Sequence, residues 1–186
     1  MVYLIRHTRA SVDARVCYGR LDVPLADTSA AEIAAVLGAL PRVHAVLSSP
    51  ARRCTILAAA VGERDRVTVR TDARLLEIDF GTWEGRCWDD VPGLELDAWA
   101  TDTWQVRPGS GESLRSLWTR IAEFRAECLT PASMGSATAT LIVSHQGPLR
   151  ALWAQANGWT PAQIFDESFA HGISGLRTLS AELLPT

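Results

Sequence analysis

The chain has 186 residues, of which 47% are hydrophobic and 21% are charged, a composition typical of one globular domain with a substantial core. The formal net charge of −3 argues against a nucleic-acid partner, which would require a broad cationic surface. No apolar run approaches the roughly 18 residues of a membrane span, and residues 1–6 lack the pattern of a signal peptide. We therefore expect a cytoplasmic protein with no membrane partner.

Short apolar runs alternate with amphipathic segments along the chain. Strands are predicted at residues 2–5, 43–47, 67–69 and 140–143, with a candidate fifth strand at 173–179. Helices are predicted at residues 29–40, 51–61, 112–128 and 149–157. This alternation predicts a single three-layer α/β/α domain over residues 1–186, with a mainly parallel central sheet.

Residues 77–112 interrupt that alternation and carry four of the seven tryptophans, namely Trp83, Trp88, Trp99 and Trp104. We interpret this segment as a small, partly helical cap inserted over one edge of the sheet, and not as a second domain. Its tryptophans could stack on a flat heteroaromatic ligand or form the core of the cap itself, and packing is the commoner use of such residues.

Five polar side chains follow predicted strands or open the helices after them. Arg6 and His7 come directly after the first strand, His145 follows the strand at 140–143, Glu77 follows the third strand region, and Arg53 lies in the first turn of the helix at 51–61. Ligands of open α/β sheets bind outside the carboxyl ends of the strands. We therefore expect these five residues to share one rim of the sheet.

Two arginines and two histidines around one spot would bind a phosphate dianion, and a neutral imidazole can attack phosphorus. Other chemistries have less support. The sequence has no His-Glu-x-x-His or Cys-x-x-Cys pair for a metal, no Gly-x-Ser-x-Gly turn for a serine nucleophile, and no lysine for a phosphate loop. The residues favour phosphoryl transfer through a histidine, with no metal and no cofactor.

The segments LIRHT, SSPARRC, LLEIDFGTWEG and VSHQGPLRAL resemble the ordered motifs of the histidine phosphatase superfamily, in its phosphoglycerate mutase-like branch. The resemblance covers residues 1 to about 155 and implies a metal-independent phosphatase. It implies that His7 becomes a phosphohistidine, while Arg6, Arg53 and His145 hold the phosphoryl oxygens. It also implies that Glu77 protonates the leaving alkoxide and later activates water.

The stretches CYGRLDVPL and LDAWATD, with RPGSGESL, resemble more narrowly the α-ribazole phosphatases of cobalamin assembly. This implies α-ribazole 5′-phosphate or a cobamide phosphate as substrate. Two alternatives stay open: a broad-specificity phosphatase of sugar or nucleotide monophosphates, and a non-catalytic module that binds a phosphorylated ligand. Because mutase relatives tend to carry longer insertions, hydrolysis is favoured over phosphoryl transfer to a second substrate position.

The partner expected at this site is a small phosphomonoester, and the sequence leaves the oligomeric state open. The residues expected to border its leaving group are Tyr18, Gly19, Arg20, Trp83 and Gln146. The sequence departs from the pattern of the relatives in three ways: Thr8 replaces a glycine common in the superfamily, and Gln146 replaces a residue that is usually small. The asparagine that many relatives carry a few residues after the first histidine has no counterpart, because Ser11 and Asp13 occupy that region. His44 and His171 are assigned no catalytic role.

Overall fold

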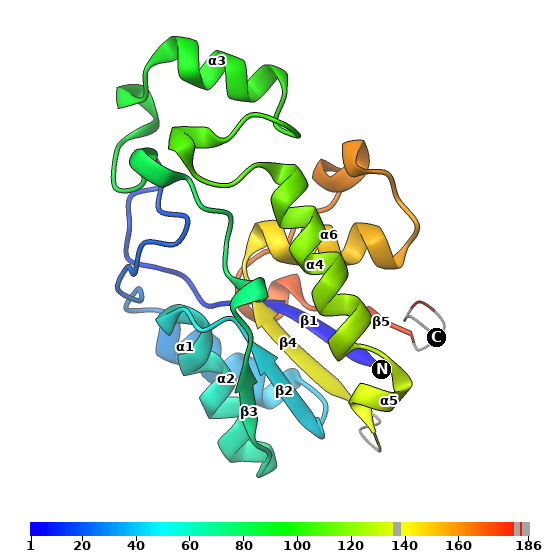
Figure 1. The fold of residues 1–186 in the computed structure, drawn as a ribbon. Helices are drawn as coiled ribbons and strands as arrows, with labels where there is room; N and C mark the ends of the chain where they lie inside the picture. The colour runs from blue at the N-terminus through cyan, green and yellow to red at the C-terminus, as the bar shows by residue number, and fades with distance from the viewer. Residues whose placement is uncertain (136–138, 181–182, 184–186) are drawn as a thin grey trace.

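The computed structural model describes residues 1–135, 139–180 and 183, and these form a five-stranded sheet in the order β3-β2-β4-β1-β5 (Figure 1). The strands are β1 (Val2–Arg6), β2 (Ala45–Ser48), β3 (Val69–Thr71), β4 (Thr140–Ser144) and β5 (Arg177–Leu179). Neighbouring strands are parallel except for β5, which pairs antiparallel with β1. The predicted mainly parallel sheet is confirmed.

Helices cover both faces of the sheet, which confirms the three-layer prediction (Figure 1). On one face lie α1 (Ser29–Ala39) and α2 (Arg52–Asp65). On the other face lie α4 (Leu114–Cys128), the short α5 (Pro131–Met134) and α6 (Gln146–Ala156). In the described part of the chain, no helix is long and apolar enough to cross a bilayer.

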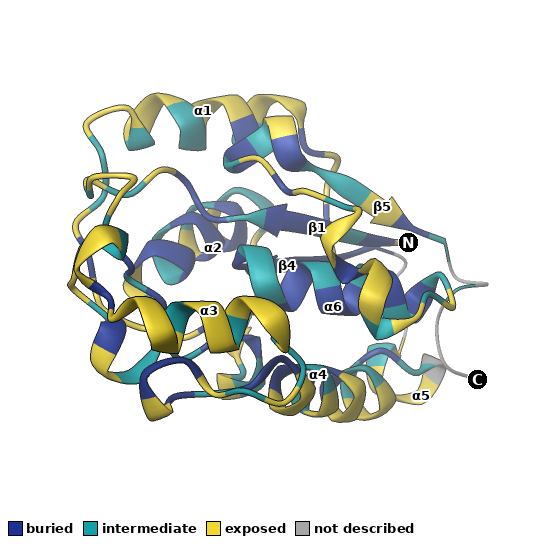
Figure 2. Cartoon of the chain, turned by 90° about the horizontal axis from the view of Figure 1, so that it is seen from above, coloured by how far each residue is buried: buried dark blue, intermediate teal, exposed yellow. Residues whose placement is uncertain are grey.

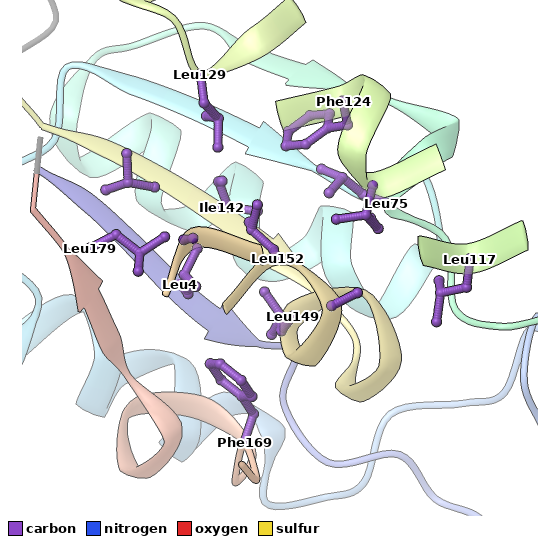
Figure 3. Close-up of a cluster of buried hydrophobic side chains, with 14 of the residues drawn as sticks. Leu4, Leu75, Leu117, Phe124, Leu129, Ile142, Leu149, Leu152, Phe169 and Leu179 are labelled. Atoms are coloured by element: carbon purple, nitrogen blue, oxygen red, sulfur yellow. The ribbon is translucent and has the colours of Figure 1, made fainter. Parts of the chain in front are cut away.

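Alternation along the strands supplies the core on both sides of the sheet. Every residue of β4 is buried. Its Ile142 packs in the cluster under α4 and α6, whereas Leu141 and Val143 pack in the cluster under α1 and α2, because successive strand side chains point to opposite faces. Figure 3 shows the first cluster, in which Leu149 and Leu152 of α6 meet Leu4 of β1.

The third strand lies two residues later than predicted. The strand expected at 67–69 is Val69–Thr71, because Val67 takes part in ending α2. Arg66 adopts a left-handed conformation with φ of 58°, and the amide of Val67 donates to the carbonyl of Gly62 (3.0 Å), a common way to terminate a helix.

Several other boundaries also differ from the prediction, and the largest difference within the sheet is in the last strand. The candidate strand at 173–179 is extended only over Arg177–Leu179, because a 3₁₀ turn occupies Gly172–Gly175. That turn is so tight that a Cβ on Gly175 would lie 2.0 Å from the carbonyl oxygen of Ala170. The helix expected at 149–157 begins three residues earlier, directly after His145.

The cap segment, residues 77–112, crosses the region beyond the carboxyl ends of the strands (Figure 1). It contains α3 (Gly93–Thr101), whose residues are almost all exposed (Figure 2). Beneath α3, the cap has an aromatic core in which Trp83 is fully buried, and Trp88 and Trp99 stack with ring centroids 6.5 Å apart. Packing within the cap is therefore one use of its tryptophans.

Candidate active site

Adjacent strands bring His7 and His145 together. β1 and β4 are paired in register, with Arg6 opposite Ser144, so the residues that follow the two strands lie side by side. The ring centroids of His7 and His145 are 5.1 Å apart, and both side chains are buried. The expected convergence of the two histidines at the carboxyl rim is observed.

The hydrogen bonds of His7 determine which ring nitrogen is free. Its Nδ1 lies 2.7 Å from the carbonyl oxygen of Thr8. Because a carbonyl can only accept, Nδ1 carries the proton and Nε2 keeps its lone pair. Burial, and then the charges of Arg6 and Arg53, lower the pKa of His7 well below its ordinary value, against the Thr8 hydrogen bond that raises it. His7 therefore presents a neutral imidazole with a free lone pair on Nε2, which is the form that a nitrogen nucleophile requires.

His145 is also neutral, and its tautomer is the opposite one. The Nε–H of Arg53 donates to Nδ1 of His145 (3.2 Å), so the proton is on Nε2, which lies 2.8 Å from Oγ of Ser49. Burial and the neighbouring His7 and Arg53 lower the pKa of His145 well below its ordinary value. In this structure the single N–H of the neutral ring is therefore directed at Ser49, and a phosphoryl oxygen would take the place of that partner.

Arg53 is buried at the start of α2 and is held by neutral groups. Its Nη2 and Nη1 donate to the carbonyls of Gly19 (2.6 Å) and Leu21 (2.9 Å), and its guanidinium lies 5.3 Å from the ring centroid of Tyr18. Across the described residues, no carboxylate forms an ion pair with Arg53 or Arg6. Two positive charges are therefore available to an anion.

Gln146, the first residue of α6, positions Arg6. Its Oε1 accepts from the backbone amide of Phe169 (3.0 Å) and from Nη1 of Arg6 (3.4 Å), and its Nε2 donates to Ser168 (3.1 Å). Nη1 of Arg6 also donates to the carbonyl of Phe169 (3.3 Å). Gln146 thereby joins α6, the segment before β5 and the Arg6 side chain.

The carboxyl group of Glu77 contacts the start of α6. Its Oε1 accepts from the amides of Ile78 (3.0 Å) and Gly147 (3.1 Å). Its backbone carbonyl accepts from Arg20 (3.1 Å) and Arg120 (3.2 Å). Burial raises the pKa of Glu77, opposed by the Ile78 amide and by the nearby arginines, so the protonated form that a general acid requires persists to higher pH.

A cavity of about 230 Å³ opens beside Glu77. Its walls are almost entirely apolar, and three aromatic side chains contribute to them: Phe80 and Trp99 from the cap, and Phe165. The charged and amide groups that line it are Glu77, Gln146 and Arg150. This arrangement suits a leaving group with a large apolar part and a few polar atoms.

The sequence matches the family of proteins described as the histidine phosphatase superfamily (branch 1) over residues 2–176. The chain belongs to this superfamily. A glucosyl-3-phosphoglycerate phosphatase of Mycobacterium tuberculosis is 34% identical over 166 residues, which cover 81% of this chain and 72% of the relative. Phosphoserine phosphatase 1 of Hydrogenobacter thermophilus is 27% identical over 161 residues, which cover 83% of this chain and 75% of that protein.

The solved structures show the same fold. The α-ribazole phosphatase from Shigella flexneri superimposes with a TM-score of 0.82 at 25% identity, over 92% of this chain and 86% of that one. A mycobacterial glucosyl-3-phosphoglycerate phosphatase superimposes with a TM-score of 0.75 at 25% identity, over 92% of this chain and 86% of that one. The superfamily consists of phosphatases and mutases, and the prediction of a histidine phosphatase enzyme is confirmed.

Within this histidine phosphatase, the residues expected to border the leaving group separate into two sets. Gln146 lines the cavity. Tyr18 and Gly19 contact Arg53 instead, and Arg20 binds the backbone of Glu77 and the carboxylate of Glu112 (3.2 Å). These three residues contact Arg53, Glu77 or Glu112 and do not line the cavity.

Trp83 also lies away from the cavity walls. It is 1% exposed within the cap core, where its Nε1 donates to Glu95 (2.9 Å). Phe80 and Trp99 provide the aromatic walls in its place.

Two further residues of this histidine phosphatase were not predicted to belong to the site. Arg150 lies one helical turn after Gln146 in α6, a spacing that places both on one face, and its Nε donates to the carbonyl of Glu167 (2.6 Å). His171 packs edge-on against His7, with ring centroids 5.3 Å apart. Nothing in the local sequence of His171 indicates that contact.

Proposed function

We propose that this chain hydrolyses phosphomonoesters through a phosphohistidine at Nε2 of His7. The observation that carries the proposal is the free lone pair on Nε2 of the buried, neutral His7 ring, which feels the charges of Arg6 and Arg53. Neither arginine forms an ion pair with a carboxylate within the described residues. Arg6, Arg53 and His145 would hold the phosphoryl oxygens. Phosphoryl transfer depends mainly on such positioning and charge stabilisation.

In the first step, Nε2 of His7 bonds to phosphorus while the bond from phosphorus to the ester oxygen breaks. Protonated Glu77 donates its proton to the departing alkoxide. In the second step, the Glu77 carboxylate takes a proton from water, whose oxygen bonds to phosphorus. The nitrogen–phosphorus bond breaks, so that inorganic phosphate leaves and His7 is restored.

For the substrate we propose α-ribazole 5′-phosphate or the corresponding cobamide phosphate. The apolar cavity beside Glu77 supports this assignment, because Phe80 and Trp99 can stack on a flat heteroaromatic base next to the ester oxygen. The structural likeness to the α-ribazole phosphatase from Shigella flexneri supports it independently. Gln146 and Arg150 would then face the polar atoms of the ribose.

The second candidate is a phosphatase of sugar or other small monophosphates with broad specificity. One observation favours it: Arg150 is among the residues that line the cavity, and its cation would pair with a carboxylate on the leaving group. The 34% identity to a glucosyl-3-phosphoglycerate phosphatase points in the same direction.

A panel of substrates compared by kcat/KM distinguishes the two candidates. We expect α-ribazole 5′-phosphate or the cobamide phosphate to exceed glucosyl-3-phosphoglycerate, phosphoserine and glycerol phosphate by at least about tenfold, the effect of one good apolar subsite. Equal values across the panel would favour broad specificity. If the protein did not hydrolyse p-nitrophenyl phosphate, the remaining alternative would be a non-catalytic module that binds a phosphorylated ligand.

A pair of variants tests the cavity itself. Trp99→Leu removes an aromatic wall, whereas Trp104→Leu removes a tryptophan that packs on Trp118 and does not line this cavity. The ratio of kcat/KM for α-ribazole 5′-phosphate to that for glycerol phosphate cancels general damage to the enzyme. That ratio should fall in Trp99→Leu and stay unchanged in Trp104→Leu.

A further inference from the structure

Buried polar atoms without a partner gather around the nucleophile. The described residues contain six such side-chain atoms, and three of them belong to residues that neighbour His7 in the sequence or in space: Nε of Arg6, Oγ1 of Thr8 and Nε2 of His171. Arg6 and Thr8 flank His7 in sequence, and His171 packs against its ring. Because polar atoms are rarely buried without a hydrogen bond, this clustering indicates that their partner arrives with the ligand.

His171 approaches His7 from the side opposite His145. On one side of β1, Arg6 pairs with Ser144 of β4, and His145 follows that strand. On its other side, Arg6 forms a parallel bridge with His171. The rings of His145 and His171 lie 5.1 Å and 5.3 Å from that of His7, at interplanar angles of 63° and 62°. His7 is therefore flanked by two imidazoles.

The protonation state of His171 suits a single-donor role. Burial and the charge of Arg6 lower its pKa to about 4, against the attraction of Glu32. The ring is neutral near pH 7 and carries one N–H. Its Nε2 is buried and has no hydrogen-bond partner, whereas its Nδ1 is not one of the buried atoms that lack a partner. A buried donor without a partner gains most when a ligand supplies an acceptor.

We propose that His171 is a phosphate-binding residue, whose Nε2–H donates to an oxygen of the phosphoryl group carried by His7. The hydrogen bond would reach the phosphoryl group from the side of β1 opposite His145. The inference rests on the proposed phosphohistidine chemistry and extends the phosphate site beyond the four residues predicted to form it.

Two substitutions separate hydrogen bonding from packing. His171→Gln keeps an N–H donor at about the reach of Nε2, whereas His171→Leu keeps most of the volume and removes the donor. The readouts are the dissociation constant of inorganic phosphate by calorimetry and the inhibition constant of vanadate with p-nitrophenyl phosphate as substrate. His44→Leu, at an exposed position away from the site, is the matched control.

We expect His171→Leu to weaken phosphate and vanadate binding by about 10- to 100-fold, the effect of losing a hydrogen bond to a charged group. His171→Gln should stay within about threefold of wild type, as should His44→Leu. Equal losses in the Gln and Leu variants, or no loss in either, would show that His171 only packs against His7 and would overturn the proposal.

Two measures keep the result interpretable. If His171→Leu does not fold, as judged by circular dichroism, His171→Phe takes its place, because it retains an aromatic ring against His7 without a donor. Calorimetry with inorganic phosphate requires no turnover. A chain that binds phosphate but hydrolyses nothing would therefore contradict the proposed function while still testing His171.

Discussion

The carboxyl oxygen Oε1 of Glu77 accepts a hydrogen bond of 3.1 Å from the amide of Gly147, at a position where a Cβ on Gly147 would lie only 2.5 Å from that oxygen. The glycine therefore lets the proposed general acid rest on the first turn of α6. A side chain at this position would displace the carboxyl group without removing it.

Gly147→Ala should lower kcat for esters of poor leaving groups by about 10- to 100-fold, because a carboxyl displaced by about 1 Å transfers its proton poorly. p-Nitrophenyl phosphate should be much less affected, since its leaving group needs little protonation. The dependence of kcat on leaving-group pKa checks this, and an equal loss for all leaving groups would contradict it.

Gly38→Ala is the matched control for that substitution. Gly38 lies in α1 with no atom within 4 Å of an added Cβ. Alanine there should stabilise the fold by about 0.5–1 kcal/mol through helix propensity and leave the dependence on leaving group unchanged.

His7→Ala should abolish turnover and the acid-labile phosphoenzyme, because the nucleophilic Nε2 is lost while the strand that carries it remains. Quenching after a brief reaction with labelled substrate measures the phosphoenzyme, and circular dichroism checks the fold. Label retained on a histidine of His7→Ala would refute the assignment of the nucleophile.

Inorganic phosphate should stabilise the folded protein, because it neutralises Arg6 and Arg53, which form no ion pair within the described residues. At a phosphate concentration 100 times Kd, the gain is about 2.7 kcal/mol, which raises Tm by roughly 5–10 °C. Thermal unfolding with and without phosphate measures it. Arg53→Met should remove most of the increase, and an increase of full size in this variant would contradict the role of Arg53.

The stability of the protein should fall as pH decreases from about 6.5. His7, His145 and His171 all have pKa values lowered by burial, so the unfolded chain binds protons that the folded chain does not. The three histidines contribute fully to the free energy of unfolding above pH 6.5, and this contribution is lost as the pH falls. For His171 the loss continues down to its pKa of about 4.

The pH dependence of Tm in wild type and in His171→Gln tests this contribution. The variant lacks one of the titrating groups, so its Tm should decline less steeply between pH 6.5 and 4. Parallel curves would show that His171 titrates normally in the folded protein.

The part of the site that the sequence predicts is the part fixed by strand order. Arg6 ends β1, and His7 and His145 directly follow β1 and β4. Parallel neighbouring strands end at the same rim of the sheet, whatever the conformation of their loops. Arg53 follows from the same rule, because it opens the helix after β2.

The surroundings of Arg20 and His171 could not be predicted from the sequence, because they depend on long-range loop contacts. Arg20 turns toward Glu77 because Glu84, 64 residues away, accepts from the amides of Arg20 (2.8 Å) and Leu21 (2.6 Å). His171 reaches His7 because the tight turn at Gly172–Gly175 sets the path into the antiparallel β5. Neither contact leaves a periodic or local signal in the sequence.

The first residues of α6, together with the residue before it, contact several different parts of the proposed site. His145 packs against His7, and Gln146 accepts a hydrogen bond from Arg6. One turn or less further along, the amide of Gly147 donates to Glu77, and Arg150 lines the cavity. Evolution toward a new substrate through this helix would disturb the reaction machinery at the same time. The cap supplies Phe80 and Trp99 to the cavity from a separate stretch of chain. Substitutions in the cap can therefore change the preference for a leaving group while the proposed phosphoryl-transfer residues stay the same.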